Sequence, residues 1–508
     1  MVLPFPPSRN RGPIVHVSST RKTSVVCVLL AVVLAGGLLW RPALSMGEGL
    51  WGAQDPWTNG DFIGARWLFW SAATAGDQLK LVAWPSGEAP LLRSFPNPFD
   101  GWMLGSIIAL LPFPLGWNLM MLGHHLANVG ATVVLARSAG ARAVPAIAAG
   151  ALVGASPVML YEVMLGHTIT AAVWPGLLGL ALLLRGRGTA AGLLIGIQGL
   201  FYLYTGLAFG LAALLLRPQR GLAAALAVVA PYLIWLWPML PAAEAVPPPD
   251  GHTSLPLDSL LWASSQQHFR IHPALLIGLI SPLLLPGQER VKRVRWTLVA
   301  LLALFLAVGP QVAWSRGDAL FTSPLAWVQH LIPGMGRMHH PVRASMLLVP
   351  ALAVGTALAL HRWPKAAGVA LLLMVLPTWR TIDNTCAWPE APIPPGADQA
   401  AFLAQHEGGV IDLGSRSMEA LALQPIHGRP VLSGFHPRAQ PRPGVDPSLG
   451  IRVNAWAKGE PQPGLPRLLR RAGFTHVLVV DRGARSPVDA SAVEAALGPP
   501  VVPGVYAL

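Results

Sequence analysis

The chain has 508 residues, of which 53% are hydrophobic and 12% are charged, and its mean hydropathy is +0.51. A soluble domain carries about 25% charged residues, so the composition excludes an ordinary water-soluble protein and predicts one surrounded largely by lipid. The net charge of +13 would suggest nucleic acid in a soluble protein. Here the basic residues lie between apolar segments, without the interleaved aromatic residues that grip bases. We therefore expect membrane lipids as partners and no nucleic acid.

The N-terminal part of the chain consists of a basic tail and one apolar segment. Residues 1–22 are polar, and an apolar run follows over 23–40. The run is longer than the apolar core of a signal peptide, which has about 7–15 residues. We therefore expect a retained helix whose N-terminus lies in the cytoplasm. The loop 41–102, rich in proline, glycine and tryptophan, comes next; a loop of this length is usually functional.

The rest of the first 379 residues alternates between apolar segments and short polar connections. At about 20 residues per crossing, these segments and the first one predict about 11 transmembrane helices. The run 189–216 is too long for one crossing, so we expect two short helices that meet near Tyr202–Gly206. The other predicted spans cover 114–136, 143–160, 168–184, 222–240, 273–286, 296–310, 344–360 and 366–379.

The basic residues fall at every second end of these spans. They are Arg137 and Arg142, Arg185 and Arg187, Arg217 and Arg220, and the clusters 290–295 and 362–365. The positive-inside rule assigns such clusters to the cytoplasm, which agrees with a cytoplasmic N-terminus. The loops 41–102, 161–167, 241–272 and 311–342 then lie together on the outer face of the inner membrane.

The character of the chain changes after residue 380. Residues 381–396 are rich in proline, as linkers are. Strand-like runs follow at 409–413, 429–434, 475–481 and 501–508, with helical patterns at 463–474 and 489–497. This alternation predicts a small C-terminal α/β domain on the periplasmic side. The expected organisation is a cytoplasmic tail (1–22), a transmembrane domain (23–379) and an extracytoplasmic domain (380–508).

Three aspartates of the loop 41–102 are candidates for chemistry: Asp55, Asp61 and Asp100. A carboxylate in an enclosed site can act as a general base, or it can hold a divalent cation such as Mg²⁺ or Mn²⁺. The alternative is that each aspartate caps a helix or faces water. Asp61 follows the turn pair Asn59-Gly60 and precedes an apolar run, as an N-cap residue does.

A second candidate pair, Glu162 and His167, lies in the predicted loop 161–167. Ionisable groups at the membrane boundary are costly and often functional; the alternative is that these two only reach toward the interface. His124 and His125 lie within a span. They are interpreted as polar helix contacts or pore-lining groups rather than as a metal site.

The stretch GMGRMHHPVR forms a basic cluster before a late span, although the alternation of charge assigns it to the outer face. Arginine forks suit phosphate oxygens, so the cluster indicates either a phosphorylated substrate or contact with lipid head groups. Its candidate binding residues are Arg337, His339, His340 and Arg343.

The order of these features resembles the GT-C class of membrane glycosyltransferases, which use polyprenyl-phosphate sugars. Members of that class combine one helix, a long outer loop with an early aspartate, many spans and a small outer domain. The similar stretches are NGDF, ASPVMLYEVMLGHTITAAVWP, GLFYLYTGLAFG, GMGRMHHPVRA and IHGRPVLSGFHPR. The resemblance implies transfer of a sugar from a polyprenyl-phosphate donor to a glycan, lipid or protein acceptor at the outer face.

The resemblance also implies roles for single residues. Asp61 would be the catalytic base, with Asp55 as the second choice, and Arg337 and Arg343 would hold the lipid phosphate. Glu162 matches the region of a second acidic motif that helps to bind metal in the class. The strict paired form of that motif is absent here, so the metal requirement stays open. The predicted substrate site is completed by His167, Asp100, His339 and His340.

Two other functions are consistent with parts of the sequence. A transporter or flippase of a lipid-linked glycan would carry charges deep within its spans and an inverted repeat; the sequence has few such charges and no clear repeat. A non-catalytic scaffold with the GT-C architecture would explain the absence of the paired acidic motif. The pattern favours the enzyme over both.

Overall fold

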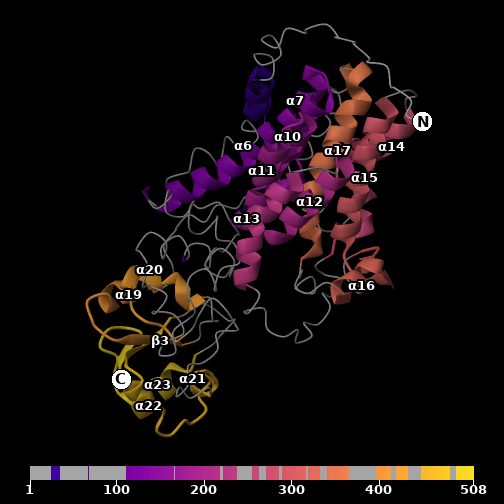
Figure 1. Ribbon diagram of the computed structural model, residues 1–508. Helices are drawn as coiled ribbons and strands as arrows, with labels where there is room; N and C mark the ends of the chain where they lie inside the picture. Colours follow the sequence, from indigo (N-terminus) through magenta and orange to yellow (C-terminus); the bar gives the residue numbers. More distant parts are fainter. Residues whose placement is uncertain are drawn as a thin grey trace, which may run out of the picture.

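A computed structural model of the chain is mostly helical and contains two small sheets. Figure 1 shows a helical bundle and, at its lower end, a smaller unit that carries the C-terminus. The residues described are 25–34, 67, 110–111, 113–164, 166–217, 221–236, 254–261, 270–284, 289–315, 318–331, 340–363, 365–366, 396–413, 419–432, 448–480 and 488–508.

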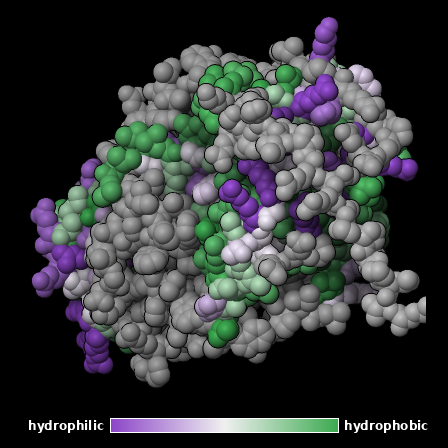
Figure 2. Space-filling model, turned by 45° about the horizontal axis from the view of Figure 1, so that its top comes forward, coloured by the Kyte–Doolittle hydropathy of each residue, from purple (hydrophilic) through white to green (hydrophobic). Residues whose placement is uncertain are grey.

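Several helices of the described residues are apolar enough to lie in a membrane. Two of them, Leu115–Ala139 and Pro341–Ala359, are long enough to cross it alone. Ala143–Gly154 and Pro157–Val163, bent by 51° at their junction, make a third span if they are counted together. Shorter apolar helices include Trp174–Leu184 and Leu203–Leu216. These helices support a membrane protein, whereas the predicted number of about 11 spans stays a prediction. Among the coloured residues in Figure 2, hydrophobic ones form several patches on the surface.

The bundle is organised around helix α17, all 15 residues of which are buried. α17 packs against α7, α14 and α15, and α6 packs against α7 and α10. α11 packs against α10, α12 and α13. The bundle helices are α6 (Phe113–Ala139), α7 (Ala143–Gly154), α10 (Trp174–Leu184), α11 (Gly188–Phe201), α12 (Leu203–Leu216), α13 (Gly221–Leu236), α14 (Pro273–Leu284), α15 (Glu289–Val308) and α17 (Ser345–Ala359).

Glycines set the closest approaches between these helices. A Cβ atom added at Gly192 of α11 would lie 1.8 Å from the carbonyl oxygen of Gly221, the first residue of α13. One added at Gly278 of α14 would lie 2.4 Å from the carbonyl oxygen of Leu352 in α17. Small residues let the backbones of membrane helices come into van der Waals contact. The bundle is therefore closed by backbone contact at positions that tolerate no side chain.

The predicted pair of short helices within 189–216 is confirmed. α11 ends at Phe201 and α12 begins at Leu203, with the extended residue Tyr202 (φ −155°) between them. At the far end of α12, the Arg295 guanidinium donates a hydrogen bond of 3.3 Å to the carbonyl oxygen of Leu216. Lys292 lies beside Gly140, just after α6. The basic residues near the ends of α6 and α12 and at the start of α15 therefore share one end of the bundle, as the alternation of charge predicts.

The predicted polar loop 311–342 has its own structure in its described residues. Strands β1 (Gln311–Ala313) and β2 (Ala319–Thr322) form an antiparallel hairpin, and helix α16 (Pro324–Leu331) follows. The 3-10 helix η8 (Pro341–Ala344) then leads directly into α17. A further 3-10 helix, η5 (Leu257–Leu261), lies in the predicted loop 241–272.

The C-terminal unit is a three-stranded sheet covered by short helices. Strand β3 (Gly409–Leu413) pairs in parallel with β4 (Phe474–Val479), which pairs antiparallel with β5 (Val505–Ala507). These elements confirm the predicted strand at 409–413 and, in part, those at 475–481 and 501–508. The helices are α19 (Ala397–Leu403), η10 (Glu419–Ala422), α20 (Gln424–His427), α21 (Leu449–Ala457), α22 (Leu465–Arg471) and α23 (Ala490–Leu497).

Two local predictions are wrong. The loop expected at 161–167 is helical at its start, because α8 (Pro157–Met164) runs through Glu162. The bundle helix breaks earlier, at 155–156, since Pro157 has no N–H group to continue it. The strand expected at 429–434 does not form in its described residues: Val431 makes one isolated bridge to Val410. Pro430 cannot donate to a sheet ladder.

Candidate active site

The candidate site begins at the turn between α8 and α9 (Thr168–Ala171). Gly166 has a φ of +69°, a left-handed conformation that glycine adopts without strain. The His167 N–H donates a hydrogen bond of 3.0 Å to the carbonyl oxygen of Glu162. This turn brings the two side chains together, and His167 Nδ1 lies 2.9 Å from Glu162 Oε2. Two residues predicted from one short stretch therefore form a polar pair.

Glu162 is held by a second donor from the same stretch. The hydroxyl of Thr170 donates to Glu162 Oε2, and it lies 3.2 Å from the carbonyl oxygen of His167. Glu162 is only 5% exposed and Thr170 is fully buried. A buried carboxylate is costly unless it is paired and hydrogen-bonded. The sequence between 162 and 170 thus supplies both the carboxylate and the donors that stabilise it.

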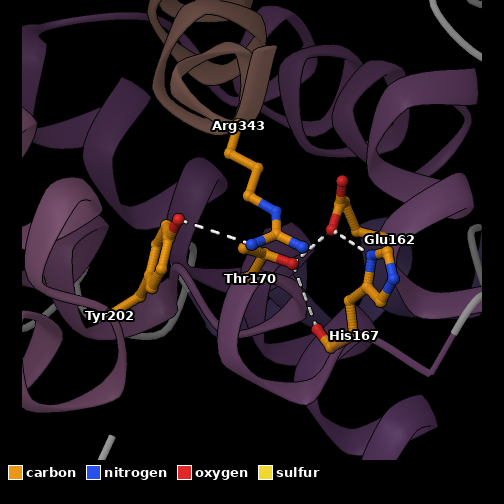
Figure 3. A network of polar contacts seen from close by, with 5 residues as sticks. All are labelled: Glu162, His167, Thr170, Tyr202 and Arg343. Atoms are coloured by element: carbon orange, nitrogen blue, oxygen red, sulfur yellow. Dashed lines mark hydrogen bonds and ion pairs between the residues drawn. The ribbon is translucent and has the colours of Figure 1, made fainter. Parts of the chain in front are cut away.

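Arg343 of η8 comes to this pair from a distant part of the chain. Its Nη1 atom donates a hydrogen bond of 3.4 Å to the hydroxyl of Tyr202, and its guanidinium carbon lies 5.5 Å from the centre of the Tyr202 ring. The positive charge of Arg343 also acts on Glu162. Figure 3 shows the guanidinium between Tyr202 on one side and Glu162, His167 and Thr170 on the other. The site therefore combines one carboxylate with a fixed cation and an imidazole.

Buried amides fix the backbone behind the turn. The chain breaks between α9 and α10 at residues 172–173, which frees backbone groups. Asn128 of α6 donates to the carbonyl oxygen of Ala171 (2.6 Å) and accepts from the N–H of Val173 (3.0 Å). Gln198 of α11 donates to the carbonyl oxygen of Ala172 (2.9 Å). These contacts satisfy groups that would otherwise be costly at this depth.

The structure describes four of the predicted site residues. Glu162, His167 and Arg343 belong to one network, whereas His340 is exposed at the start of η8, where its carbonyl oxygen accepts the Arg343 N–H (3.0 Å). Tyr202, which the sequence reasoning missed, could be recognised only as the break between two apolar helices. Outside the described residues lie Asp55, Asp61, Asp100, Arg337 and His339.

The possible divalent cation stays a prediction, because Asp55, Asp61 and Asp100 lie outside the described residues. The described residues contain no group of three or more His, Cys, Asp or Glu side chains that could hold an ion. Mg²⁺ and Mn²⁺ need several oxygen ligands, and Glu162 offers one carboxylate. His124 is a polar helix contact, as interpreted from the sequence: Trp174 Nε1 lies 3.3 Å from its Nδ1 atom, and its ring stands edge-on to Phe201.

The loop 41–102 contacts the C-terminal unit through one described residue. Trp67 is fully buried, and its Nε1–H donates a hydrogen bond of 2.6 Å to Gln424 Oε1 of α20. Gln424 Nε2 donates to the carbonyl oxygen of Arg429, whose guanidinium donates to the carbonyl oxygen of Ala404 after α19. The stretch that follows Asp61 is thus joined to a hydrogen-bonded network in α19 and α20.

Acid is expected to loosen this network through His427. Burial, helped by the charge of Arg429, lowers the pKa of His427 to about 4 from its usual 6.5, and its Nδ1 accepts the Arg429 N–H at 2.9 Å. The unfolded chain binds this proton between pH 6.5 and 4 while the folded chain does not. The stabilisation is therefore complete above pH 6.5 and falls as the pH approaches 4, by about 3 kcal/mol.

Hydrogen exchange of the full chain, corrected for intrinsic rates, measures this loss at β3 and α20. The His427→Asn variant keeps an acceptor but does not titrate, so its protection should change less between pH 7 and 4.5. An equal change in both proteins would show that another group carries the effect.

The fold resembles that of two solved structures of glycosyltransferases. An arabinofuranosyltransferase, AftD, from Mycobacteria superposes with a TM-score of 0.55 at 16% identity, over 90% of this chain and 36% of the other. The Archaeoglobus fulgidus oligosaccharyltransferase gives 0.54 at 12% identity, over 91% of this chain and 70% of the other. The chain has a GT-C-like fold, which confirms the predicted architecture at that level. It spans about a third of the length of AftD. No protein-family model and no curated protein matches the sequence.

Proposed function

We propose that the chain is a glycosyltransferase that moves a sugar from a polyprenyl-phosphate donor to an acceptor at the outer face of the inner membrane. The observation that carries the proposal is the Arg343 network, in a fold shared with glycosyltransferases. A fixed guanidinium at the end of apolar helices suits a ligand with a charged head and a long apolar tail. Both features belong to a polyprenyl phosphate.

Arg343 is preorganised for this role. Tyr202 holds the guanidinium from one side through its hydroxyl and ring, and the neighbouring Glu162 balances part of its charge. Charge-assisted hydrogen bonds to an oxyanion are about twice as strong as neutral ones. His167, fixed by Glu162, would add a second donor beside the phosphate, and Arg337 a second guanidinium. Arg343, His167 and Arg337 would together stabilise the negative charge of the leaving phosphate.

The reaction is a displacement at the anomeric carbon of the donor sugar. The acceptor hydroxyl oxygen forms a new bond to that carbon, while the bond between the anomeric carbon and the phosphate oxygen breaks. Asp61 would take the hydroxyl proton, and the polyprenyl phosphate would leave with the bonding electrons. A carboxylate base and preorganised cations are the groups that this step requires.

Binding of farnesyl phosphate to the full chain in nanodiscs tests the phosphate site. We expect saturable binding, and the Arg343→Gln variant should bind about 10- to 100-fold more weakly, because one charge-assisted contact contributes about 1.5–3 kcal/mol. Arg217→Gln, at the basic end of the bundle, is the matched control and should bind as the wild-type chain does. Equal binding of farnesol, or unchanged binding by Arg343→Gln, would remove the phosphate role from Arg343.

The chemistry is tested with a radiolabelled polyprenyl-phosphate sugar in proteoliposomes. Release of polyprenyl phosphate together with a labelled acceptor supports the transferase. Movement of the intact lipid-linked sugar between leaflets, without release of polyprenyl phosphate, would identify a flippase instead. Neither reaction, despite retained binding of farnesyl phosphate, would favour the non-catalytic scaffold.

A further inference from the structure

The hairpin β1–β2 and helix α16, together the 311–331 unit, expose an unusual amount of apolar surface. Four large side chains within 14 residues of sequence are at least half exposed: Trp314 at 50%, Leu320 at 56%, Phe321 at 59% and Trp327 at 73%. All four residues of β2 are exposed. In water, an exposed apolar edge strand invites aggregation. Some partner therefore has to cover this surface.

The unit is firmly attached to the bundle, so its exposed face points outward in a fixed way. Leu325 of α16 and Ala313 of β1 are buried. The Ser323 hydroxyl donates to the carbonyl oxygen of Gly309 at 2.6 Å and accepts from the Leu325 N–H at 3.2 Å. The N–H of Asp258 donates to the carbonyl oxygen of Trp314 at 3.0 Å. One side of the unit is thus packed, and the apolar side is left to its surroundings.

The position of the unit along the chain indicates what those surroundings are. It follows the end of α15 and precedes the apolar helix Pro341–Ala359, which can span a membrane. It therefore lies where the chain leaves the hydrocarbon layer and re-enters it, at the end of the bundle that holds Arg343. Figure 1 shows α16 at that lower end. Tryptophan favours the level of the head groups.

The backbone sets how deep the unit can lie. β2 pairs with β1 alone, so in the described residues its other edge keeps unpaired N–H and C=O groups. Such groups are costly in hydrocarbon but can bond to water and head groups. Short strands with apolar side chains and a free polar edge therefore fit the boundary between head groups and acyl chains. The adjacent exposed Asp318 also fits a hydrated layer.

We infer that the 311–331 unit is a membrane-docking surface that places Trp314, Leu320, Phe321 and Trp327 at the boundary between head groups and acyl chains. Its partner is the lipid bilayer, rather than a second protein. This inference does not depend on glycosyl transfer. Docking of the 311–331 unit would fix the depth of the neighbouring η8 relative to the lipid surface. The depth of Arg343 would be fixed with it.

The experiment uses an environment-sensitive fluorophore on the full chain in phosphatidylcholine vesicles. Cys27→Ala and Cys386→Ser provide the background, and NBD is attached at Phe321→Cys or Trp327→Cys. Because both side chains are exposed, labelling leaves the packed side intact; Leu320→Cys is a further reporter. Glu407→Cys, exposed on the C-terminal unit, is the matched control. Lipids with a doxyl group at carbon 5 or carbon 12 report depth.

We expect NBD at 321 and 327 to emit at shorter wavelength than NBD at 407 and to be quenched more by carbon-5 than by carbon-12 lipids. Water-like emission without quenching would overturn the inference. A blue shift without quenching would also overturn it, because protein rather than lipid would then cover the surface. Stronger quenching by carbon-12 lipids would place the unit in the hydrocarbon core and contradict the proposed depth.

Discussion

Asp61→Ala is expected to lower glycosyl transfer by about 10²–10⁴-fold, the usual contribution of a general base, without lowering the amount of protein in the membrane. The acceptor hydroxyl is a poor nucleophile until its proton is removed, and the resemblance of the loop 41–102 to GT-C enzymes singles out this aspartate. Asp61 lies outside the described residues. The measurement is turnover of a radiolabelled polyprenyl-phosphate sugar in proteoliposomes at saturating donor.

Three controls separate this role from a general defect of the loop. Asp77→Ala, in the same loop, should keep full activity. Asp55→Ala and Asp100→Ala should lose less activity than Asp61→Ala. Arg343→Gln should raise the KM for the donor, whereas Asp61→Ala should lower kcat and leave the binding of farnesyl phosphate intact. If Asp61→Ala turns over at the wild-type rate, Asp61 is removed from the mechanism, and Asp55 becomes the next candidate base.

The local part of the candidate site was predictable from the sequence. Glu162 and His167 lie five residues apart around a glycine, so their contact depends on one turn whose geometry Gly166 provides. The alternation of basic residues also predicted that this turn and the stretch before Arg343 share one side. The structure brings Glu162 and Arg343 into one network, to which Tyr202 also belongs. Contacts between residues close in sequence, and the assignment of loops to one side of a membrane, can thus be predicted from the sequence.

The packing that selects particular partners was not predictable. Tyr202 and Arg343 are 141 residues apart, and their contact exists because α12 and η8 pack together in the bundle. Nothing in the apolar run 189–216 distinguishes Tyr202 from Tyr204 as the arginine partner. Asn128 and Gln198 are polar residues within the apolar runs 114–136 and 189–216, and the sequence does not indicate their partners. Their side chains donate hydrogen bonds to backbone carbonyl groups at the break before α10. Only the fold reveals these partners.

The contact of Trp67 with Gln424 joins the loop 41–102 to the C-terminal unit. Trp67 lies six positions after Asp61, and Gln424 belongs to a network that also includes Arg429 and His427. The loop that would supply the base is therefore attached to the C-terminal unit, while Arg343 belongs to the bundle. In the proposed enzyme, base and phosphate site are held by different parts of the chain, so the C-terminal unit contributes to their relative position.

Gly192→Ala is expected to lower the stability of the helical bundle. The added methyl group would lie 1.8 Å from the Gly221 carbonyl oxygen and 2.8 Å from the Ala224 Cβ, so α11 and α13 would have to separate. Overpacking of a well-packed core costs about 1–3 kcal/mol and occasionally more; contact with rigid backbone puts this variant at the upper end. The melting temperature of the detergent-solubilised full chain, measured by size exclusion after heating, should fall clearly.

Gly210→Ala in α12 is the matched control, because a Cβ atom there meets nothing within 4 Å. Alanine is favoured over glycine in a helix by about 1 kcal/mol, so this variant should melt at the wild-type temperature or above it. The two substitutions are chemically identical and should change stability in opposite directions, since one adds a methyl group to a backbone contact and the other to open space. Equal melting temperatures for the two variants would show that α11 and α13 do not make this contact.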